Sequence, residues 1–407
     1  MLRRRLITSS LLLPLAGGSL WLRPEDAAAV AAAPDGGAKP GSARFLLVFL
    51  RGGYDAASLL VPVSSNFYYE SRTDIAIARP SAELSSALPL TADWGLHPAL
   101  RESMYPLYQR GELAFVPFAG TDDHSRSHFE TQDSIELGQS LQGHRDFNSG
   151  FMNRLAEVLH GSTPMAFTDQ LPTTFKGAVN VPNTGLKSLA KPSVDARQSE
   201  LIASMYKGTP LAGAVQEGFA VRAEVMRELS SEMDAANRNA ITAKGFELEA
   251  RRIARLMRES YSLGFVDVGG WDTHVGQGGA TGYLANRLDE LGHGLAAFAQ
   301  EMGDSWKNTT VVVVSEFGRT FRQNGNRGTD HGHGSVYWVL GGSVHGGRIA
   351  GEQVAVERKM LFEDRDYQVL NDYRALLGGL LARQYGLGAS QLERVFPGVA
   401  ARDLALL

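Results

Sequence analysis

The chain has 407 residues, of which 43% are hydrophobic and 21% are charged, a composition typical of a globular protein with a sizeable core. Its net charge of −4 gives no general attraction to nucleic acid, and no basic cluster interleaved with aromatic residues points to that partner. The sequence contains no cysteine, which excludes disulfides, thiolate metal sites and a cysteine nucleophile.

The N-terminal segment is typical of a secretory signal peptide. Arginines at 3–5 precede an apolar stretch at 11–22 that is too short to span a bilayer comfortably, and small residues with an A-x-A cleavage pattern follow at 27–33. Consecutive arginines favour the twin-arginine export machinery, with an ordinary Sec signal or an uncleaved anchor as alternatives. We therefore expect residues 1–33 to be a signal peptide and the protein to be periplasmic or secreted.

The first half of the mature chain alternates between strand and helix patterns. Residues 34–43, rich in Gly, Pro and Ala, are expected to be a linker. The apolar run at 44–50 predicts a central parallel strand. Further along, the patterns predict a helix, a strand and two amphipathic helices at 99–110, 113–118, 125–139 and 148–159.

The second half continues this alternation after an irregular segment. Residues 162–215 lack strong periodicity and are expected to form loops or a cap over the sheet, and 216–257 have the apolar spacing of a long helix. A strand, a helix, two strands and a helix are then predicted at 261–268, 281–303, 309–315, 335–341 and 366–385. The order predicts one α/β domain over 44–407, with a mostly parallel sheet flanked by helices on both faces.

Three short polar segments lie at predicted strand ends. Gly-Gly-Trp-Asp-Thr-His (269–274) and Ser-Glu-Phe-Gly-Arg-Thr (315–320) follow strands, and Thr-Asp-His-Gly-His-Gly (329–334) precedes one. Carboxylates and imidazoles at neighbouring strand ends can converge on one point, where ligands bind in open α/β sheets. Because these side chains hold Zn, Mn, Mg or Ca, the sequence predicts a divalent metal site at the edge of the sheet.

The first two polar segments each contain candidate ligands. Asp272 and His274 can both reach one ion if the turn curls around it; otherwise Asp272 caps the turn and His274 is a surface residue. Glu316 follows four valines that demand burial, so its carboxylate must be paired, hydrogen-bonded or metal-bound. It can pair with Arg319, whose guanidinium can instead face a phosphate or sulfate oxyanion.

The third polar segment and the end of the first strand supply the other candidates. Asp330, His331 and His333 lie among glycines that let the backbone approach a ligand closely, and a flexible polar loop is the alternative. Asp55 follows the strand at 44–50 in Arg-Gly-Gly-Tyr-Asp and is either a ligand or a helix cap.

Candidate nucleophiles lie where the helix at 125–139 begins. The hydroxyls of Ser125 and Ser127, and less securely Thr121, can act if a metal lowers their pKa; plain N-capping is the alternative. Five of the ten histidines fall in three clusters, which are His124 with His128, His274 alone, and His331 with His333. The remaining histidines have the pattern of ordinary surface or core residues, and they are His97, His144, His160, His293 and His345.

The ordered motifs resemble the DUF1501 family of exported bacterial proteins. They are the twin-arginine-like start, Leu-Arg-Gly-Gly-Tyr-Asp, Ser-Arg-Ser-His-Phe, Gly-Trp-Asp-Thr-His, Ser-Glu-Phe-Gly-Arg-Thr and Asp-His-Gly-His-Gly. That family in turn resembles the alkaline phosphatase and sulfatase superfamily. The resemblance implies a mostly parallel sheet between helices, with divalent metals at the C-terminal ends of its strands.

The resemblance also implies roles for individual residues. Asp55 stands for the acid after the first strand, Asp272 and His274 for an Asp-x-x-x-His pair with shorter spacing, and His331 or His333 for a late histidine. Where the superfamily has Asp-His, this chain has Ser315-Glu316, so one ligand differs and the adjacent histidine is absent. The nucleophile has no matching motif residue, with Ser127 and Ser125 as candidates. If the protein is a hydrolase, we expect Arg319, and with it Arg126, to hold the oxyanion.

Two functions follow from this resemblance. The first is an exported metal-dependent hydrolase of phosphate or sulfate esters, acting on a small-molecule or polymer substrate. The alternative is a non-catalytic exported metal-binding protein of the same fold that binds an envelope or extracellular polymer. The altered ligand and the unsettled nucleophile motivate the alternative.

Overall fold

The computed structural model describes residues 43–407 with the exception of 143, 188–195 and 230–244. The expected signal peptide at 1–33 and all but the last residue of the expected linker at 34–43 lie outside the described residues. Among the described helices, none combines the length and the apolar character needed to cross a bilayer.

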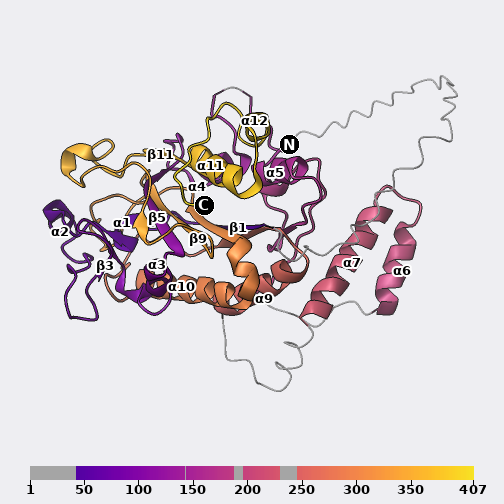
Figure 1. Ribbon diagram of the computed structural model, residues 1–407, viewed down its shortest axis with the longest axis horizontal. Helices are drawn as coiled ribbons and strands as arrows, with labels where there is room; N and C mark the ends of the chain where they lie inside the picture. Colours follow the sequence, from indigo (N-terminus) through magenta and orange to yellow (C-terminus); the bar gives the residue numbers. More distant parts are fainter. Residues whose placement is uncertain (1–42, 143, 188–195, 230–244) are drawn as a thin grey trace, which may run out of the picture. The chain divides into compact units, whose positions relative to one another are not determined.

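The fold is built on a sheet of eight strands in the order β10-β5-β9-β8-β1-β7-β6, with β11 also pairing β5 (Figure 1). Their bounds are Arg44–Leu50 (β1), Leu113–Gly120 (β5), Pro164–Ala166 (β6), Leu263–Val268 (β7), Thr309–Ser315 (β8), Ser335–Gly341 (β9), Arg348–Ile349 (β10) and Asn371–Asp372 (β11). β1 is parallel to both β7 and β8, whereas β9 is antiparallel to β5 and β8. The predicted mostly parallel α/β sheet is therefore confirmed.

The central strands are those that the apolar runs predict. Every residue of β1 and of β8 is buried, as expected for strands covered on both faces. Their register places Val48 of β1 between Val266 of β7 and Val313 of β8. The carboxyl ends of β1, β7 and β8 consequently meet at one edge of the sheet, and the polar segments that follow them begin there.

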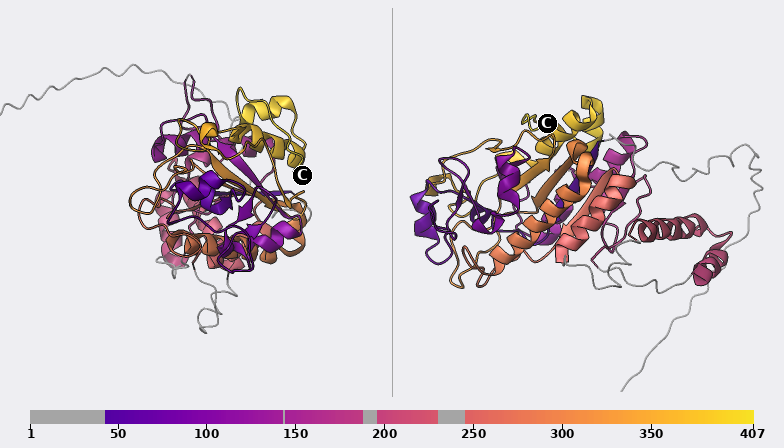
Figure 2. Two further views of the ribbon diagram at one scale, coloured as in Figure 1. Left: turned by 90° about the vertical axis from the view of Figure 1, so that its left-hand side faces the viewer. Right: turned by 60° about the horizontal axis from the view of Figure 1, so that its bottom comes forward.

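Helices cover both faces of this sheet (Figures 1 and 2). The α-helices of the described residues are Ala56–Leu59 (α1), Asn66–Ser71 (α2), Met104–Gln109 (α3), His128–Leu137 (α4), Phe151–Val158 (α5), Ala196–Tyr206 (α6), Ala212–Glu228 (α7), Gly245–Glu259 (α9), Tyr283–Met302 (α10), Tyr373–Tyr385 (α11) and Ala389–Val395 (α12), and not all of them cover the sheet. Residues of α3, α9 and α10 belong to the core on one face, and residues of α5, α11 and α12 to the core on the other.

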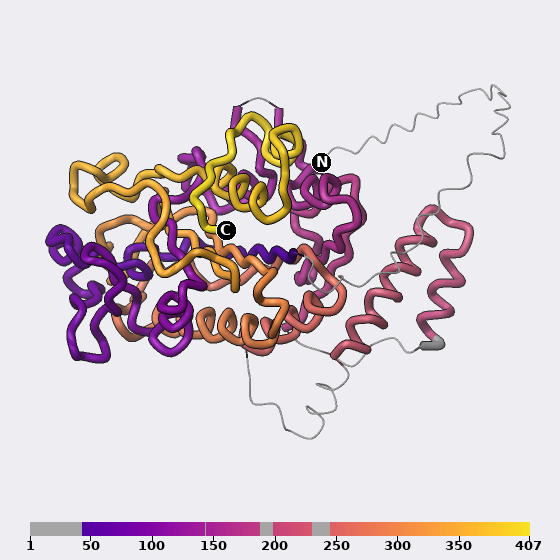
Figure 3. The backbone as a smooth tube through the Cα atoms, viewed as in Figure 1, coloured from indigo at the N-terminus to yellow at the C-terminus, as the bar shows by residue number. Residues whose placement is uncertain are grey.

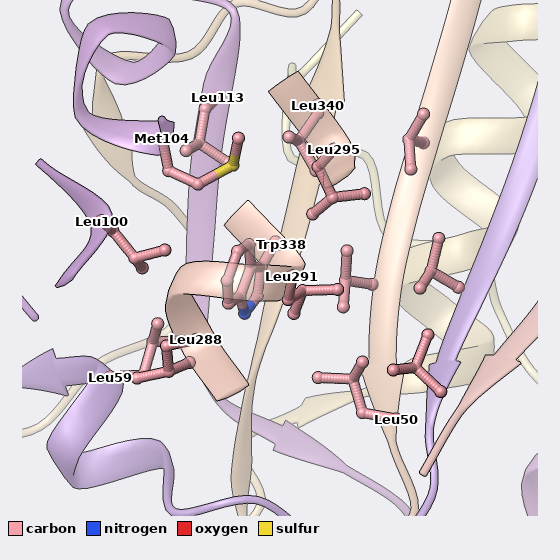
Figure 4. Close-up of a cluster of buried hydrophobic side chains, with 14 of the residues drawn as sticks. Leu50, Leu59, Leu100, Met104, Leu113, Leu288, Leu291, Leu295, Trp338 and Leu340 are labelled. Atoms are coloured by element: carbon pink, nitrogen blue, oxygen red, sulfur yellow. The ribbon is translucent and has the colours of Figure 1, made fainter. Parts of the chain in front are cut away.

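Alternation along β1 divides the core into these two halves. Leu46, Val48 and Leu50 face the half that contains α10, and Phe45, Leu47 and Phe49 face the opposite half, because successive side chains of a strand point to opposite faces. Figure 4 shows the first half, where leucines of α10 lie against side chains of β9; the labelled members are Leu288, Leu291, Leu295, Trp338 and Leu340.

The structure differs from the sequence prediction in the irregular middle of the chain. The segment at 162–215 contributes the sheet strand β6 and the helix α6, as well as loops. In place of one helix over 216–257, α7 ends at Glu228 and α9 begins at Gly245, which has a φ of 58° that favours glycine. The last predicted helix begins later, at Tyr373, where the Asp372 side chain caps it. A small second sheet of Leu60–Val61 (β2), Gly95–Leu96 (β4) and Leu88–Pro89 (β3) was not predicted.

Candidate metal centre

Three histidines from distant segments meet at the carboxyl edge of the sheet. His128 begins α4, His274 follows β7, and His331 precedes β9. The Nε2 atom of His331 lies 3.0 Å from Nε2 of His128 and 3.1 Å from Nε2 of His274. Asp272 Oδ1 lies 2.9 Å from His274 Nε2 and 3.3 Å from His331 Nε2. Asp272 Oδ2 lies 3.6 Å from His128 Nε2, so four side chains turn their ligand atoms to one small space.

The Nδ1 atom of each ring lies against an oxygen that can only accept a hydrogen bond. The Nδ1 contacts are 2.8 Å from His128 to Glu316 Oε1, 3.0 Å from His274 to Asp330 Oδ1, and 2.9 Å from His331 to the carbonyl oxygen of Arg126. Each Nδ1 must therefore carry a proton, and in a neutral ring the lone pair of Nε2 faces the shared space.

These residues fit a divalent metal ion. The converging lone pairs repel one another unless a cation lies between them or one ring carries a second proton, and tetrahedral Zn–N bonds of about 2.1 Å would place ligand atoms roughly 3.4 Å apart. The ligand atoms of His128, Asp272 and His331 lie within 4.8 Å of one another, and His274 lies against two of these residues. A nitrogen-rich set suits Zn or another transition metal better than Mg or Ca, which prefer oxygen.

Glu316 lies behind His128 rather than in the shared space. Its side chain is fully buried, and its Oε1 accepts hydrogen bonds from the Gly52 amide at 2.7 Å and from Gln132 Nε2 at 2.9 Å, in addition to the His128 ring. Burial alone would raise the pKa of Glu316, but these hydrogen bonds, that from His128 foremost, lower it below its usual value. The resulting carboxylate raises the pKa of His128 and fixes the orientation of its ring.

Arg319 anchors Asp272 and does not face the solvent. Its buried guanidinium donates to the Asp272 carboxylate and to the carbonyl oxygens of Gly52, Gly53, Trp271 and Thr329. Burial favours a higher pKa for Asp272, but the hydrogen bond and charge of Arg319 lower it, which keeps Asp272 ionised. Because its N–H groups are engaged in this way, Arg319 has none directed to a substrate oxyanion.

Asp55 is not brought into the metal centre. Its carboxylate is buried in a two-pronged ion pair with Arg72, whose Nη2 lies 2.9 Å from Oδ1. Ser58 and Gln277 also donate to Oδ2, at 2.7 and 2.6 Å. Burial alone would raise the pKa of Asp55, but Arg72 lowers it, so the acid is ionised and already neutralised by a guanidinium.

His333 is also separate from the three converging histidines. Its ring packs edge-on against His124, with 4.7 Å between centroids, and lies 5.1 Å from the ring of Phe362. Burial, followed by the charges of His124 and Arg126, lowers the pKa of His333 to about 4. Asp330, by contrast, supports the metal centre from behind, since it holds His274.

The predicted nucleophiles lie directly before His128. Ser127 occupies the N-cap position of α4, yet its side chain makes no capping bond, and the hydroxyl has no hydrogen-bond partner in the described part of the chain. Ser125 Oγ accepts from the Ser127 amide at 3.2 Å. Arg126, between them, pairs with Glu363 at 2.7 Å and with Asp366 at 3.1 Å, so its guanidinium is not free for an oxyanion.

Glycine permits the close packing of the loops around the centre. A Cβ at Gly52 would lie 2.7 Å from the backbone nitrogen of Asp272, and one at Gly332 would lie 2.4 Å from the backbone of Arg319. Gly52 also has a φ of 125°, which side chains rarely allow. The loops after β1, β7 and β8 can approach one another only because these positions lack side chains.

Sequence reasoning assigned no role to His128. A histidine at the start of a predicted helix gives no local sign of metal binding, and its partner Glu316 lies 188 residues away. The available signal was the concentration of histidines in three clusters, because one member of each cluster enters the metal centre.

Comparison with solved structures finds distant likenesses. A protein in the alkaline phosphatase superfamily from Vibrio parahaemolyticus has a TM-score of 0.39 and 12% identity, covering 90% of this chain and 70% of that chain. Ps i-CgsB in complex with k-i-k-neocarrahexaose has a TM-score of 0.39 and 10% identity, covering 86% and 74%. The C-terminal periplasmic domain of EcEptC from Escherichia coli, in complex with Zn, has a TM-score of 0.31 and 8% identity, covering 74% and 73%.

Comparison of the sequence gives the family. No curated protein matches the chain significantly. The family model described as "Protein of unknown function (DUF1501)" matches residues 42–396, which include every strand of the sheet and every ligand atom of the metal centre. The chain therefore belongs to the DUF1501 family.

Proposed function

We propose that this protein is an exported, metal-dependent hydrolase of phosphate or sulfate esters. The observation that carries the proposal is the convergence of three Nε2 atoms and the Asp272 carboxylate, with each ring fixed from behind. A divalent ion bound there would polarise an ester oxygen and lower the pKa of a water or hydroxyl. His274 and Asp272 are about two-fifths exposed, so the centre is accessible to a substrate.

The protein residues have separate tasks in this proposal. His128, His274, His331 and Asp272 hold the ion, and the carboxylates of Glu316 and Asp330 orient two of the rings and strengthen them as ligands. Arg319 positions Asp272 by charge and by its hydrogen bonds to the neighbouring loops. Asp55 and His333 hold no ion in this account.

Ser127 is our first candidate for the nucleophile. Its hydroxyl has no partner in the described residues, is only half-buried, and precedes a proposed ligand by one residue. Ser125 is the second candidate hydroxyl. We expect Ser127→Ala to abolish turnover while leaving metal content unchanged, and Ser125→Ala to retain activity. Full activity of both variants would show that neither serine attacks the ester.

Export by the twin-arginine machinery is a further part of the proposal. It rests on the arginines at 3–5, the short apolar stretch and the small residues that follow. Replacing the three arginines by lysine should leave the full chain in the cytoplasm, as measured by cell fractionation. Unchanged delivery to the periplasm would favour an ordinary Sec signal.

Hydrolysis is tested with aryl phosphate and aryl sulfate panels on the purified, metal-loaded protein. We expect turnover of at least one ester class that is lost in His331→Ala and retained in the matched control His345→Ala, since His345 is exposed and outside the metal centre. Loss of activity in the His345 variant, or equal activity in both variants, would contradict the proposal.

A non-catalytic metal-binding protein of the same fold is the second candidate. Two observations favour it, which are the full engagement of the Arg319 guanidinium and the lack of a base hydrogen-bonded to Ser127 in the described residues. Under this alternative the wild type binds metal tightly yet cleaves no ester in either panel. The protein would then bind an envelope or extracellular polymer without cleaving it.

A further inference from the structure

A polar hollow partly lined by aromatic residues lies near the small second sheet. It has a volume of about 580 Å³, and its lining includes the half-buried Phe67 and the buried Trp94. Ser64, Asn66 and Gln353 also line it. Apolar side chains beside a few hydrogen-bonding groups suit a ring that has an apolar face and many hydroxyls, as a sugar has.

A second hollow borders the metal centre. It has a volume of about 240 Å³ and is lined by Arg322, Arg365, Asn324 and Asp330 among others. Asp330 holds the ring of His274, and Arg365 donates to the carbonyl oxygen of His331 at 2.8 Å, so both walls touch residues of the centre.

Two guanidinium groups line the second hollow. The Nε of Arg365 has no hydrogen-bond partner in the described structure and lies 3.8 Å from the Asp366 carboxylate. Both Nη atoms of Arg322 donate to Asp364, which leaves the Nε of Arg322 without a hydrogen-bond partner among the described residues. The Asn324 amide already donates to the His274 carbonyl oxygen and to Asp330. The two guanidinium groups thus line a space that contains one carboxylate, that of Asp330, and guanidinium groups match sulfate and phosphate geometry.

The two hollows are neighbours. The guanidinium of Arg322, which lines the second, lies 5.3 Å from the ring of Phe67, which lines the first. Phe67 stacks on Phe321 at 5.0 Å, and Ser65 Oγ donates to the Val356 carbonyl at 2.6 Å. These contacts bind the segments at 62–72, 320–324 and 353–366 into one wall, the first in indigo and the last in yellow-orange in Figure 3.

We propose that the two hollows bind one extended ligand, a saccharide chain that carries sulfate or phosphate groups. An anionic group occupies the second hollow, and a neutral sugar ring occupies the first, because the described lining of the first includes the Asp93 carboxylate and no arginine or lysine. The inference rests on the proposed function for the role of the metal centre, and it specifies a polymer rather than a small ester as the substrate.

Binding is tested by calorimetric titration of the full chain with dextran sulfate, phosphomannan and uncharged dextran, with the metal present and after chelation. We expect at least one charged polymer to bind roughly tenfold more tightly than dextran in both states. Arg322→Gln should weaken that binding roughly tenfold, whereas Arg383→Gln, which breaks a comparable exposed pair with Asp403, should not. Asn66→Ala, in the first hollow, should weaken binding of the charged polymer and keeps the test valid if the Arg322 variant fails to fold.

The outcomes separate this inference from the proposed function. Binding of neither charged polymer, or binding that Arg322→Gln and Asn66→Ala leave unchanged, would overturn the inference even if aryl esters are cleaved. Selective binding without cleavage of any ester would uphold the inference and refute the hydrolase. Comparison of dextran sulfate with phosphomannan shows whether the bound oxyanion is a sulfate or a phosphate group.

Discussion

The buried carboxylate of Glu316 decides how His128 is presented to a metal ion. Glu316→Gln keeps the size of the side chain but removes the negative charge of the group that accepts the hydrogen bond from His128. His128 is then held less firmly and is a weaker ligand. We expect metal affinity to fall by roughly 10–100-fold, measured by competition with a metal-binding dye. Glu130→Gln on the exposed face of α4 is the control, and equal affinity of the two variants would contradict this role.

The ion pair between Asp55 and Arg72 predicts that no ion binds at Asp55. Asp55→Asn leaves Arg72 buried without a counter-charge, and breaking a buried pair in this way costs about 3–5 kcal/mol of unfolding free energy. The variant should therefore melt at a lower temperature but retain the same metal content as the wild type. Asp272→Asn should instead lose metal. A fall in metal content for Asp55→Asn with no loss of stability would mean that Asp55 is a ligand.

Helix α9 carries a buried carboxylate that should make stability depend on pH. Burial, with the nearby charge of Asp267, raises the pKa of Glu249 to about 7, while unfolded glutamate titrates near its usual value. Stability from this group is therefore fully present below the unfolded pKa and is lost as pH rises through the folded pKa, by about 3–4 kcal/mol in total.

Replacement of Glu249 isolates this effect. We expect Glu249→Gln to be more stable than the wild type at about pH 8 and to show little of this gain at about pH 5, measured by urea unfolding. The exposed Glu83→Gln is the control. An advantage for the Glu249 variant that is the same at both pH values would contradict a titrating carboxylate.

At the level of elements, long buried strands could be predicted and short ones could not. The structure gives β1, β8 and β9 the bounds that their apolar runs indicate, since burial on both faces demands such runs. β6 has three residues beginning with Pro164, and β11 has two, so neither is long enough to show a pattern. Their places depend on pairing with β7 and β5, which is a tertiary contact.

For the whole molecule, the sequence predicts the ligands that lie next to core strands. It does not predict the residues whose roles depend on contacts between distant segments. Asp272, His274 and His331 are adjacent to core strands, so their convergence follows from the order of the sheet. The hydrogen bond between His128 and Glu316, and the ion pair between Asp55 and Arg72, depend on how separate loops pack. Charge and residue type alone do not distinguish a ligand from the residue that holds it.

Metal binding should stabilise the entire domain. The proposed ligands come from segments that begin at His128 and end at His331, so an ion can join them only in the folded chain. At a metal concentration 100 times the Kd, the gain in unfolding free energy is about 2.7 kcal/mol. We expect a chelator to lower the melting temperature of the wild type and to have little effect on His274→Ala. An equal fall in both proteins would contradict metal binding at this place.

The most direct measurement is the metal content of the purified full chain, determined by mass spectrometry and repeated after reconstitution with Zn and with Mn. The geometry predicts one transition-metal ion per chain in the wild type, and almost none when His128, His274 and His331 are each replaced by alanine. A wild-type chain that binds no ion after reconstitution, or alanine variants that keep the wild-type content, would contradict the metal centre.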